Sequence, residues 1–246
     1  MTPLTEETTP RTGLIVIAAL IGFLLGQVLA TILEGLGAAL AGYPGGLSRL
    51  ASSAAPPWWA SSLGLVGLWA GFGLAVLVAY RAGGLTPWPG QWRPRWGDLV
   101  YVPFGVACQF ALDALYALFH PHGVSAPAHH LFDSTSGPTL ALVGALSVLG
   151  APVFEEWLFR GVLYRALAEG ARARLSRRAS VAFGAVVSAL LFGLAHAELL
   201  QLAGLVGLGV VLALLAERSR RLVPSWVTHA SFNATAFIAL VAQRAH

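Results

Sequence analysis

Long apolar runs are the feature that most limits what this chain can fold into. A helix needs about 20 apolar residues to cross the hydrocarbon core of a bilayer. Hydrophobic residues make up 57% of the 246 residues and charged residues only 11%, well below the roughly 25% typical of a soluble domain. The apolar runs lie at about residues 13–40, 63–80, 99–119, 140–167, 180–200, 202–216 and 224–242. The sequence therefore predicts an all-α polytopic membrane bundle of about seven transmembrane helices, within a range of six to eight.

The arginines indicate how such a bundle is oriented. All 15 basic residues are arginine, and positive charge collects in the cytoplasmic loops of multi-spanning proteins. With the N-terminus inside, only Arg49 and Arg244 fall in outside segments. The cytoplasmic segments then hold Arg11, Arg81, Arg93, Arg95, Arg165, Arg172, Arg174, Arg177, Arg178, Arg218, Arg220 and Arg221. We expect a multi-pass cell-membrane protein with a cytoplasmic N-terminus, whose first run is a retained span rather than a signal peptide.

The net charge of +4 could suggest nucleic acid as a partner. The arginines lie between apolar runs rather than along a polar groove, which argues against that class. Residues 82–97 carry three prolines and three tryptophans and are expected along the cytoplasmic interface, where tryptophan is enriched. Since no repeat is visible, residues 1–246 are interpreted as a single membrane domain.

Several polar residues outside the main pattern have simple structural interpretations. Glu34 and Asp113 are isolated acids, expected at helix ends or hydrogen-bonded to neighbouring helices. The lone Cys108 lies in an apolar run and is expected to be a small buried side chain. Four histidines follow the third run with a spacing that fits no standard metal site, so a solvated loop is expected there. They are His120, His122, His129 and His130.

Three apolar runs each carry a polar stripe. Glu156 and Arg160 are four residues apart, so they share a helix face and can pair. Glu155 is rotated by about 100° from its neighbour and can point elsewhere. The other two stripes pair Phe192 with His196 and His229 with Asn233.

An interhelical hydrogen-bond network is the structural explanation of these stripes, and such bonds contribute about 0.6–2 kcal/mol each. Two adjacent carboxylates are poorly suited to that purpose, because like charges repel in a low dielectric and push one pKa upward. Histidines, the usual proton-transfer residues, accompany them. The pattern favours a catalytic or transport site.

The three stripes resemble the three motifs of the CPBP family, which comprises type II CAAX prenyl endopeptidases and related bacteriocin-processing or bacteriocin-immunity proteins. Phe154 before the acids and Gly161 after the arginine fit the first motif as well. The resemblance covers about residues 150–235 and suggests a CPBP-like catalytic core at 138–243. The motifs read Glu155-Glu156-x-x-x-Arg160, Phe192-x-x-x-His196 and His229-x-x-x-Asn233.

The resemblance implies an intramembrane endopeptidase that hydrolyses a peptide bond of a membrane-associated protein or peptide. In the family, the first glutamate and the histidine of the second motif are thought to activate water, which implies that Glu155 is the general base and that His196 positions the water or shares its proton. The third motif then assigns oxyanion stabilisation to His229 and Asn233. Amide hydrolysis requires such a base and such donors. The residues expected to support this site are Glu156, Arg160 and Phe192.

Zinc is a possible cofactor, since members of the family are often called metalloproteases. A catalytic zinc usually has three protein ligands and a water, which Glu155, His196 and His229 could supply. The chain has no His-Glu-x-x-His pattern, and Asn233 suits an oxyanion hole better than a zinc site. A glutamate-type mechanism and a zinc-dependent one both stay open.

Two other classes of function would use the same residues. A proton-coupled transporter could relay protons through the Glu/His cluster, although such folds commonly show internal repeats. A non-catalytic immunity-type protein would act by binding and would tolerate loss of the acids. For the endopeptidase we expect one polar cavity reached from the cytoplasmic side. Its expected partners are the lipid bilayer and a membrane-associated peptide or protein substrate, with no nucleic acid and no assigned protein partner.

Overall fold

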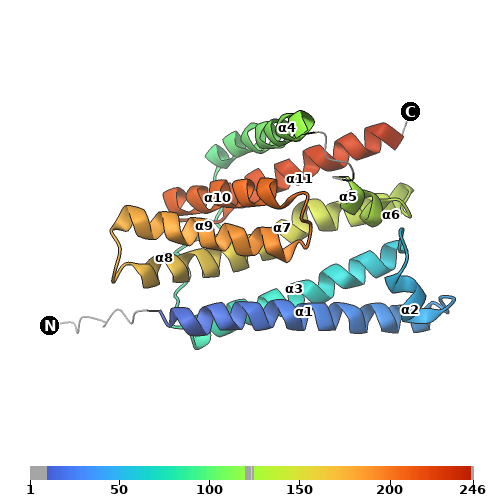
Figure 1. Ribbon diagram of the computed structural model, residues 1–246, viewed down its shortest axis with the longest axis horizontal. Coiled ribbons are helices and arrows are strands. Elements are labelled where there is room, and N and C mark those ends of the chain that lie inside the picture. Colours follow the sequence, from blue (N-terminus) through green and yellow to red (C-terminus); the bar gives the residue numbers. More distant parts are fainter. Residues whose placement is uncertain (1–9, 120–122, 124, 245–246) are drawn as a thin grey trace.

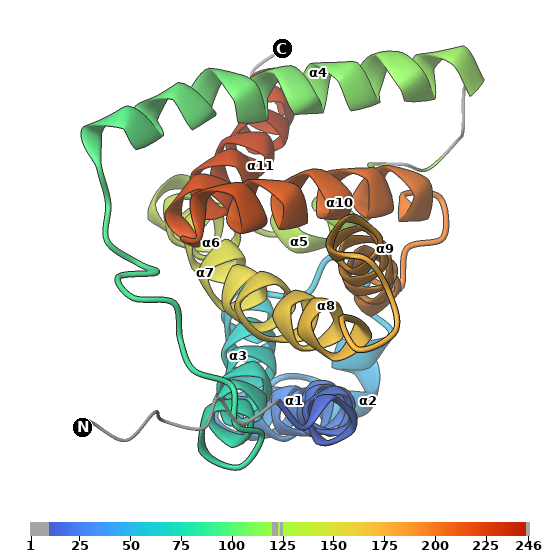
Figure 2. The same cartoon turned by 90° about the vertical axis from the view of Figure 1, so that its left-hand side faces the viewer.

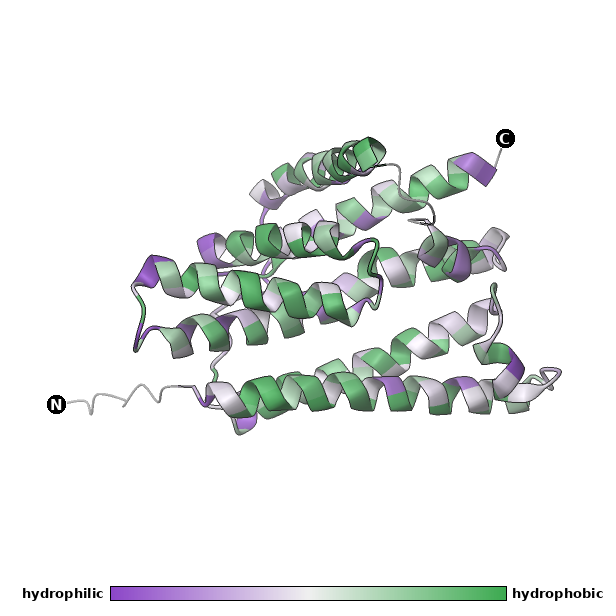
Figure 3. Ribbon diagram, in the orientation of Figure 1, coloured by the Kyte–Doolittle hydropathy of each residue, from purple (hydrophilic) through white to green (hydrophobic). Residues whose placement is uncertain are grey.

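Helices form all the regular structure in the part of the chain that the computed structural model describes, residues 10–119, 123 and 125–244. The all-α expectation is confirmed. Six helices are long and apolar enough to cross a membrane, and Figure 3 shows their hydrophobic middles between more hydrophilic ends. They are α1 (Thr12–Leu40), α3 (Trp58–Arg81), η1 with α4 (Trp96–Phe119), the helix Gly137–Ala171, α9 (Arg177–Ala195) and α10 (Leu202–Ser219).

The seventh expected run is also helical, as α11 (Val223–Arg244), 22 residues long. It is not among the six apolar helices, because polar side chains such as His229 and Asn233 lower its mean hydropathy. Two short helices, α2 (Gly46–Ala51) and α5 (Ala126–Phe132), lie in connections at the end of the bundle that also holds the C-terminus (Figure 1).

Small residues allow α1 and α3 to pack closely. Gly22, Gly26 and Ala30 recur every fourth residue on the buried face of α1. The buried face of α3 carries the matching series Gly67, Gly71 and Ala75. A Cβ built on Gly22 would lie 2.7 Å from the Cβ of Ala75. Small residues at such spacing let membrane helices approach backbone to backbone, where van der Waals packing drives their association.

The helix Gly137–Ala171 is continuous, but two π-helical segments interrupt its α-helical hydrogen bonding. It comprises α6 (Gly137–Ala145), the π-helical η2 (Leu146–Gly150), α7 (Ala151–Glu155), the π-helical η3 (Glu156–Tyr164) and α8 (Arg165–Ala171). Pro152 has no N–H to donate to the carbonyl one turn earlier, which favours a wider turn before it. π-Helical turns are rare and frequently mark functional sites. Here the second one begins at the adjacent acids.

Aromatic contacts join the α1–α3 pair to this long helix. Trp69 of α3 stacks on Phe154 with ring centroids 4.9 Å apart. One turn along α3, Phe72 meets Phe159 edge to face at 6.0 Å, and Phe159 contacts Phe192 of α9 at 5.3 Å. The acids are therefore flanked on both sides by rings that tie the helix to α3 and α9.

Helix α4 (Tyr101–Phe119) is the least embedded of the long helices. It lies across α11 on the outside of the bundle and runs in nearly the same direction as α10 (Figure 2). Gly105 lies against the backbone of Thr228 on α11, and Cys108 packs against the cluster of Leu208, Leu212 and Phe232. The expected burial of Cys108 is only partial.

Candidate active site

Glu156, Arg160 and His229 form a buried ionic cluster. Nη1 of Arg160 donates to Oε1 of Glu156 at 2.8 Å, and Nδ1 of His229 lies 3.0 Å from the same oxygen. The exposed fractions of Glu156, Arg160 and His229 are 0%, 1% and 2%. The predicted contact between Glu156 and Arg160, four residues apart, is present. Charges so deeply buried need partners of opposite sign, since removing one partner of such a pair typically costs about 3–5 kcal/mol.

Arg160 is held by two further contacts that fix its position. Its Nη2 donates to the backbone oxygen of Gly209 on α10 at 3.4 Å. Its guanidinium lies over the ring of Phe192, 4.3 Å from the centroid, where the negative face of the ring attracts the cation. The cluster thereby links the long helix to α9, α10 and α11.

Glu155 lies at the edge of this cluster, on the other side of His229 from Glu156. Its side chain is 14% exposed, and its Oε2 lies 3.6 Å from Nε2 of His229. The two nitrogens of His229 therefore face the two acids, one each. Because a carboxylate only accepts hydrogen bonds, Nδ1 of His229 carries a hydrogen toward Glu156, and Nε2 faces the side of Glu155.

His196 occupies the C-terminal cap of α9. Its Nδ1 donates to the backbone oxygen of Phe192 at 2.8 Å, which leaves Nε2 free of the hydrogen in the neutral ring. The next residue, Ala197, has a φ of 54°, a left-handed conformation that ends the helix. The ring of His196 also meets that of Phe192 edge to face, with centroids 4.7 Å apart.

Asn233 lies one turn after His229 on α11. Its Nδ2 donates to the backbone oxygen of Ser147 at 3.2 Å, within the π-helical segment that precedes Pro152. An amide nitrogen has two hydrogens, so one is committed to Ser147 and the other is available to a ligand.

One cavity of about 770 Å³ gathers the four residues predicted to carry the chemistry. Glu155, His196, His229 and Asn233 all lie in its wall. Glu156, Arg160 and Phe192, predicted to support the site, lie behind it and hold the wall in place. Within this wall Glu155 contacts His229, and His196 lines the same cavity.

Helix α4 forms the opposite wall of this cavity. Nε2 of Gln109 donates to Oδ1 of Asp113 at 2.8 Å, and both line the cavity together with Tyr116. Asp113 is thus bound within its own helix and faces the candidate site, whereas Glu34 lies outside the cavity, against Gly64 of α3. Among the expected loop histidines, His129 is 3.1 Å from Asp133, and His120 and His122 lie outside the described residues.

The arrangement does not fit a three-ligand zinc site. Among the described residues, no group of three or more His, Cys, Asp or Glu side chains is placed to hold a metal ion. Nδ1 of His229 and Nδ1 of His196 are bonded to Glu156 and to the Phe192 carbonyl, which leaves Nε2 of each ring for a ligand, but these atoms and Glu155 do not converge on one point. We therefore derive no step through a metal.

The comparison with known families bears on this segment of the chain. Residues 137–235 match the family model of the Rce1-like type II CAAX prenyl endopeptidases. This segment is therefore similar to that family. The match confirms the CPBP resemblance over a stretch, less than half of the chain, that contains every motif residue. No curated protein and no solved structure matches the chain.

The Rce1-like match supports a CAAX-type membrane protease. It gives no support to the possibility that the protease is metal-dependent. Two features of this segment have no signal in the sequence: the bridging position of His229 and the Gly209 carbonyl at Arg160. A third, the pair of π-helical turns, has only an indirect one. The proline at position 152 was the one available hint of the altered winding.

Proposed function

We propose that the protein is an intramembrane endopeptidase in which Glu155 activates a water molecule for attack on a peptide bond. The observation that carries the proposal is the shared cavity wall of Glu155, His196, His229 and Asn233, backed by a buried ionic cluster. A base must lie within hydrogen-bond reach of the water it deprotonates, and of the two acids in the described cavity wall Glu155 is the one beside His229, whereas Asp113 is bonded to Gln109 on α4.

The chemistry follows from the free atoms of these side chains. Glu155 takes a proton from water while Nε2 of His196, which holds no hydrogen, accepts the other water hydrogen and orients the nucleophile. The resulting hydroxide adds to the peptide carbonyl carbon. The second Nδ2 hydrogen of Asn233 and, in the doubly protonated ring, Nε2–H of His229 donate to the oxyanion. When the C–N bond breaks, the proton on Glu155 passes to the leaving amine, and the new carboxylic acid then gives its own proton to that amine, so that a carboxylate and an ammonium group are released.

The Glu156–Arg160 pair gives this machinery a fixed frame. Because Oε1 of Glu156 accepts from both Arg160 and His229, His229 cannot rotate without leaving a buried carboxylate short of a partner. Preorganised donors of this kind are usually the largest single contribution to stabilising an oxyanion.

The test is an unbiased search for cleavage products. Membranes from cells that express the wild-type protein or Glu155→Gln are compared by mass-spectrometric mapping of new peptide termini. We expect a set of termini that disappears with Glu155→Gln and persists with Glu34→Gln, a matched change at an intramembrane acid outside the cavity. Termini that persist in Glu155→Gln would refute the glutamate mechanism, and a preserved biological effect without cleavage would favour the immunity-type alternative.

A further inference from the structure

The two ends of the bundle differ sharply in charge. Twelve of the fifteen arginines lie at the end where α8 turns into α9 and α10 into α11, and only Arg49 and Arg244 lie at the other (Figure 1). We call these the arginine-rich and the arginine-poor end. The positive-inside rule places the arginine-rich end in the cytoplasm.

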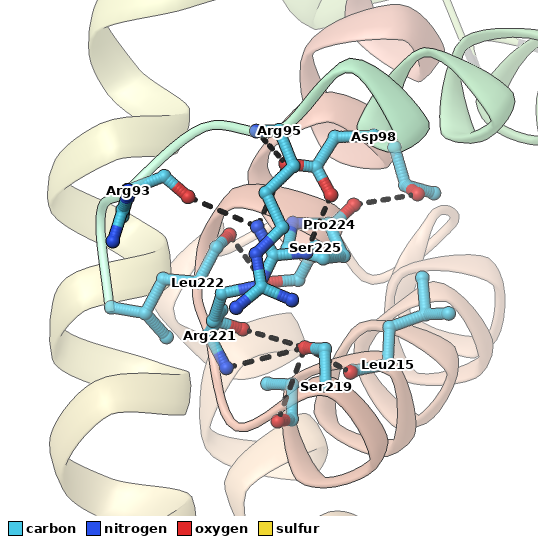
Figure 4. Close-up of polar contacts among 11 residues, drawn as sticks. Arg93, Arg95, Asp98, Leu215, Ser219, Arg221, Leu222, Pro224 and Ser225 are labelled. Atoms are coloured by element: carbon cyan, nitrogen blue, oxygen red, sulfur yellow. Dashed lines mark hydrogen bonds and ion pairs between the residues drawn. The ribbon is translucent and has the colours of Figure 1, made fainter. Parts of the chain in front are cut away.

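The arginine-rich end is closed by the α3–α4 linker, residues 82–95. Arg221 at the start of α11 donates to both carboxylate oxygens of Asp98, at 2.8 and 2.6 Å, and to the backbone oxygen of Arg93 at 3.0 Å. Figure 4 shows Arg221 reaching across to this segment. The backbone N–H of Leu222 also donates to the Gln91 carbonyl at 2.8 Å.

Side chains of the linker fill the remaining space at this end. Trp88 is 7% exposed and lies under the guanidinium groups of Arg165 and Arg220, 4.6 and 5.5 Å from its ring centroid. Nη1 of Arg165 donates to the Thr86 carbonyl at 2.7 Å. Trp88 was expected to lie along the membrane interface, but it is buried and helps to close this end of the bundle. Between these linker side chains and the acids, the long helix is buried at Leu158, Val162, Tyr164 and Ala166, each at most 1% exposed.

The cavity that holds Glu155 extends to the arginine-poor end. Its outer wall comes from the segment around α5, from the connection between α9 and α10, and from the last turns of α11. None of its described lining residues comes from the linker or from the arginine-bearing turns. The lining residues nearest that end are Gly123, Ser125, Gln201, Ala239 and Gln243. A cavity reached from the cytoplasmic side was expected, but the described lining residues place its outer part at the arginine-poor end.

We propose that substrate and water reach the site from the extracytoplasmic face, so that the substrate is a peptide segment exposed at the outer leaflet. This rests on the proposed function for the cleavage step and on the charge asymmetry for the side. The lining also holds two carboxylates, Asp113 and Glu155, and no described arginine or lysine. A free C-terminal carboxylate would find no described arginine or lysine there, only the two histidines of the proposed catalytic site, whereas a neutral or basic segment would find acceptors.

The side of access can be measured without knowing the substrate. In a Cys108→Ser background, single cysteines are introduced by Ala236→Cys in the cavity wall and by Ala173→Cys in the exposed turn after α8. Sealed right-side-out and inside-out vesicles are treated with trimethylammonium-ethyl methanethiosulfonate, a cationic reagent that does not cross membranes. Protection against a later fluorescent maleimide reports which side reached each thiol.

We expect Ala236→Cys to react in right-side-out vesicles and Ala173→Cys in inside-out vesicles. Reaction of Ala236→Cys from the inside-out face alone would overturn the proposal. A second cavity position, Ala128→Cys, decides the question if Ala236→Cys reacts from neither face. Repeating the labelling in Glu155→Gln separates the two proposals, because unchanged outside labelling with no Glu155-dependent cleavage would remove the protease assignment and keep the side of access.

The location of the cleavage sites provides an independent measure. We expect the Glu155-dependent termini to map to outer or outer-leaflet segments of their source proteins. Termini confined to cytoplasmic segments would overturn the extracytoplasmic assignment while leaving the protease in place.

Discussion

Nδ1 of His229 lies 3.0 Å from Oε1 of Glu156, so α11 is joined to the long helix by a contact wholly inside the protein. The same oxygen accepts from Arg160 at 2.8 Å. One carboxylate oxygen thus fixes both the arginine that braces three helices and the histidine that faces the catalytic space. Substitution of Glu156 is therefore expected to lower stability, and substitution of Glu155 is expected to lower the cleavage rate.

Glu156→Gln should destabilise the protein, because it leaves Arg160 buried without its counter-charge. The expected loss is about 3–5 kcal/mol, measured as a lower thermal midpoint in detergent micelles. Glu155→Gln should leave the midpoint near that of the wild type and lower the cleavage rate by about 10²–10⁴-fold, the usual contribution of a general base. Equal destabilisation by both changes would contradict this division of roles.

Asn233→Ala should slow cleavage without weakening substrate binding. A single oxyanion donor contributes about 10²–10³-fold to kcat, and an interaction made only in the transition state leaves KM unchanged. The matched control is Thr235→Ala on the same helix, whose hydroxyl only bonds the Ser231 carbonyl of its own helix at 2.8 Å. A rise in KM with constant kcat would instead assign Asn233 to ground-state binding.

Ala197 should tolerate glycine but not valine. Its φ of 54° is uncommon for any side chain and strained for a β-branched one. Strain at such a position costs about 1–3 kcal/mol. Ala197→Val is expected to shift the end of α9 and with it His196, which lowers kcat, whereas Ala197→Gly keeps or raises the thermal midpoint. Wild-type kcat in the valine variant would argue against a precise position for His196.

Gly71→Ala should loosen the α1–α3 pair. A Cβ at this position would lie 2.6 Å from the backbone of Gly26, and overpacking of this kind typically costs about 1–3 kcal/mol. Gly73→Ala is the matched control two residues along, since nothing lies within 4 Å of a Cβ there. The thermal midpoints of the two variants measure the effect, and equal midpoints would show that the helices can separate without cost.

Cleavage should survive 1,10-phenanthroline. The donors on the cavity wall do not converge on a three-ligand metal site among the described residues. The proposed mechanism therefore uses no metal ion, and a chelator should not inhibit it. Cleavage is measured before and after chelation. Loss of activity that zinc restores and magnesium does not would replace the glutamate mechanism with a metal-dependent one.

Apolar run length and motif spacing predict much of this molecule. Helices of the expected length occur at the expected places, and the i, i+4 spacing correctly pairs Glu156 with Arg160 because helix geometry alone determines that neighbour. His229 is predicted as a site residue, but its position between the two acids depends on how α11 packs against η3. Such packing involves side chains distant in sequence, which no local pattern encodes.

The wall opposite the acids and the closure of the arginine-rich end were unpredictable for a similar reason. Trp88 has the composition of an interfacial residue, yet it is buried because Arg165 and Arg220 converge on its ring. Asp113 resembles an isolated acid in the sequence. It becomes part of the cavity only because α4 lies across α11 (Figure 2), which brings its residues to the cavity wall.

The contact between Asp98 and Arg221 also bears on when the protein becomes active during its synthesis. The two residues are 123 positions apart, and chains are made and folded from the N-terminus onward. The acids therefore enter the membrane long before Arg221 can latch the linker and before His229 arrives beside them. We expect partly made chains to be inert, with an open inner end and unpaired acids, so that hydrolysis starts only after the last helix has been inserted.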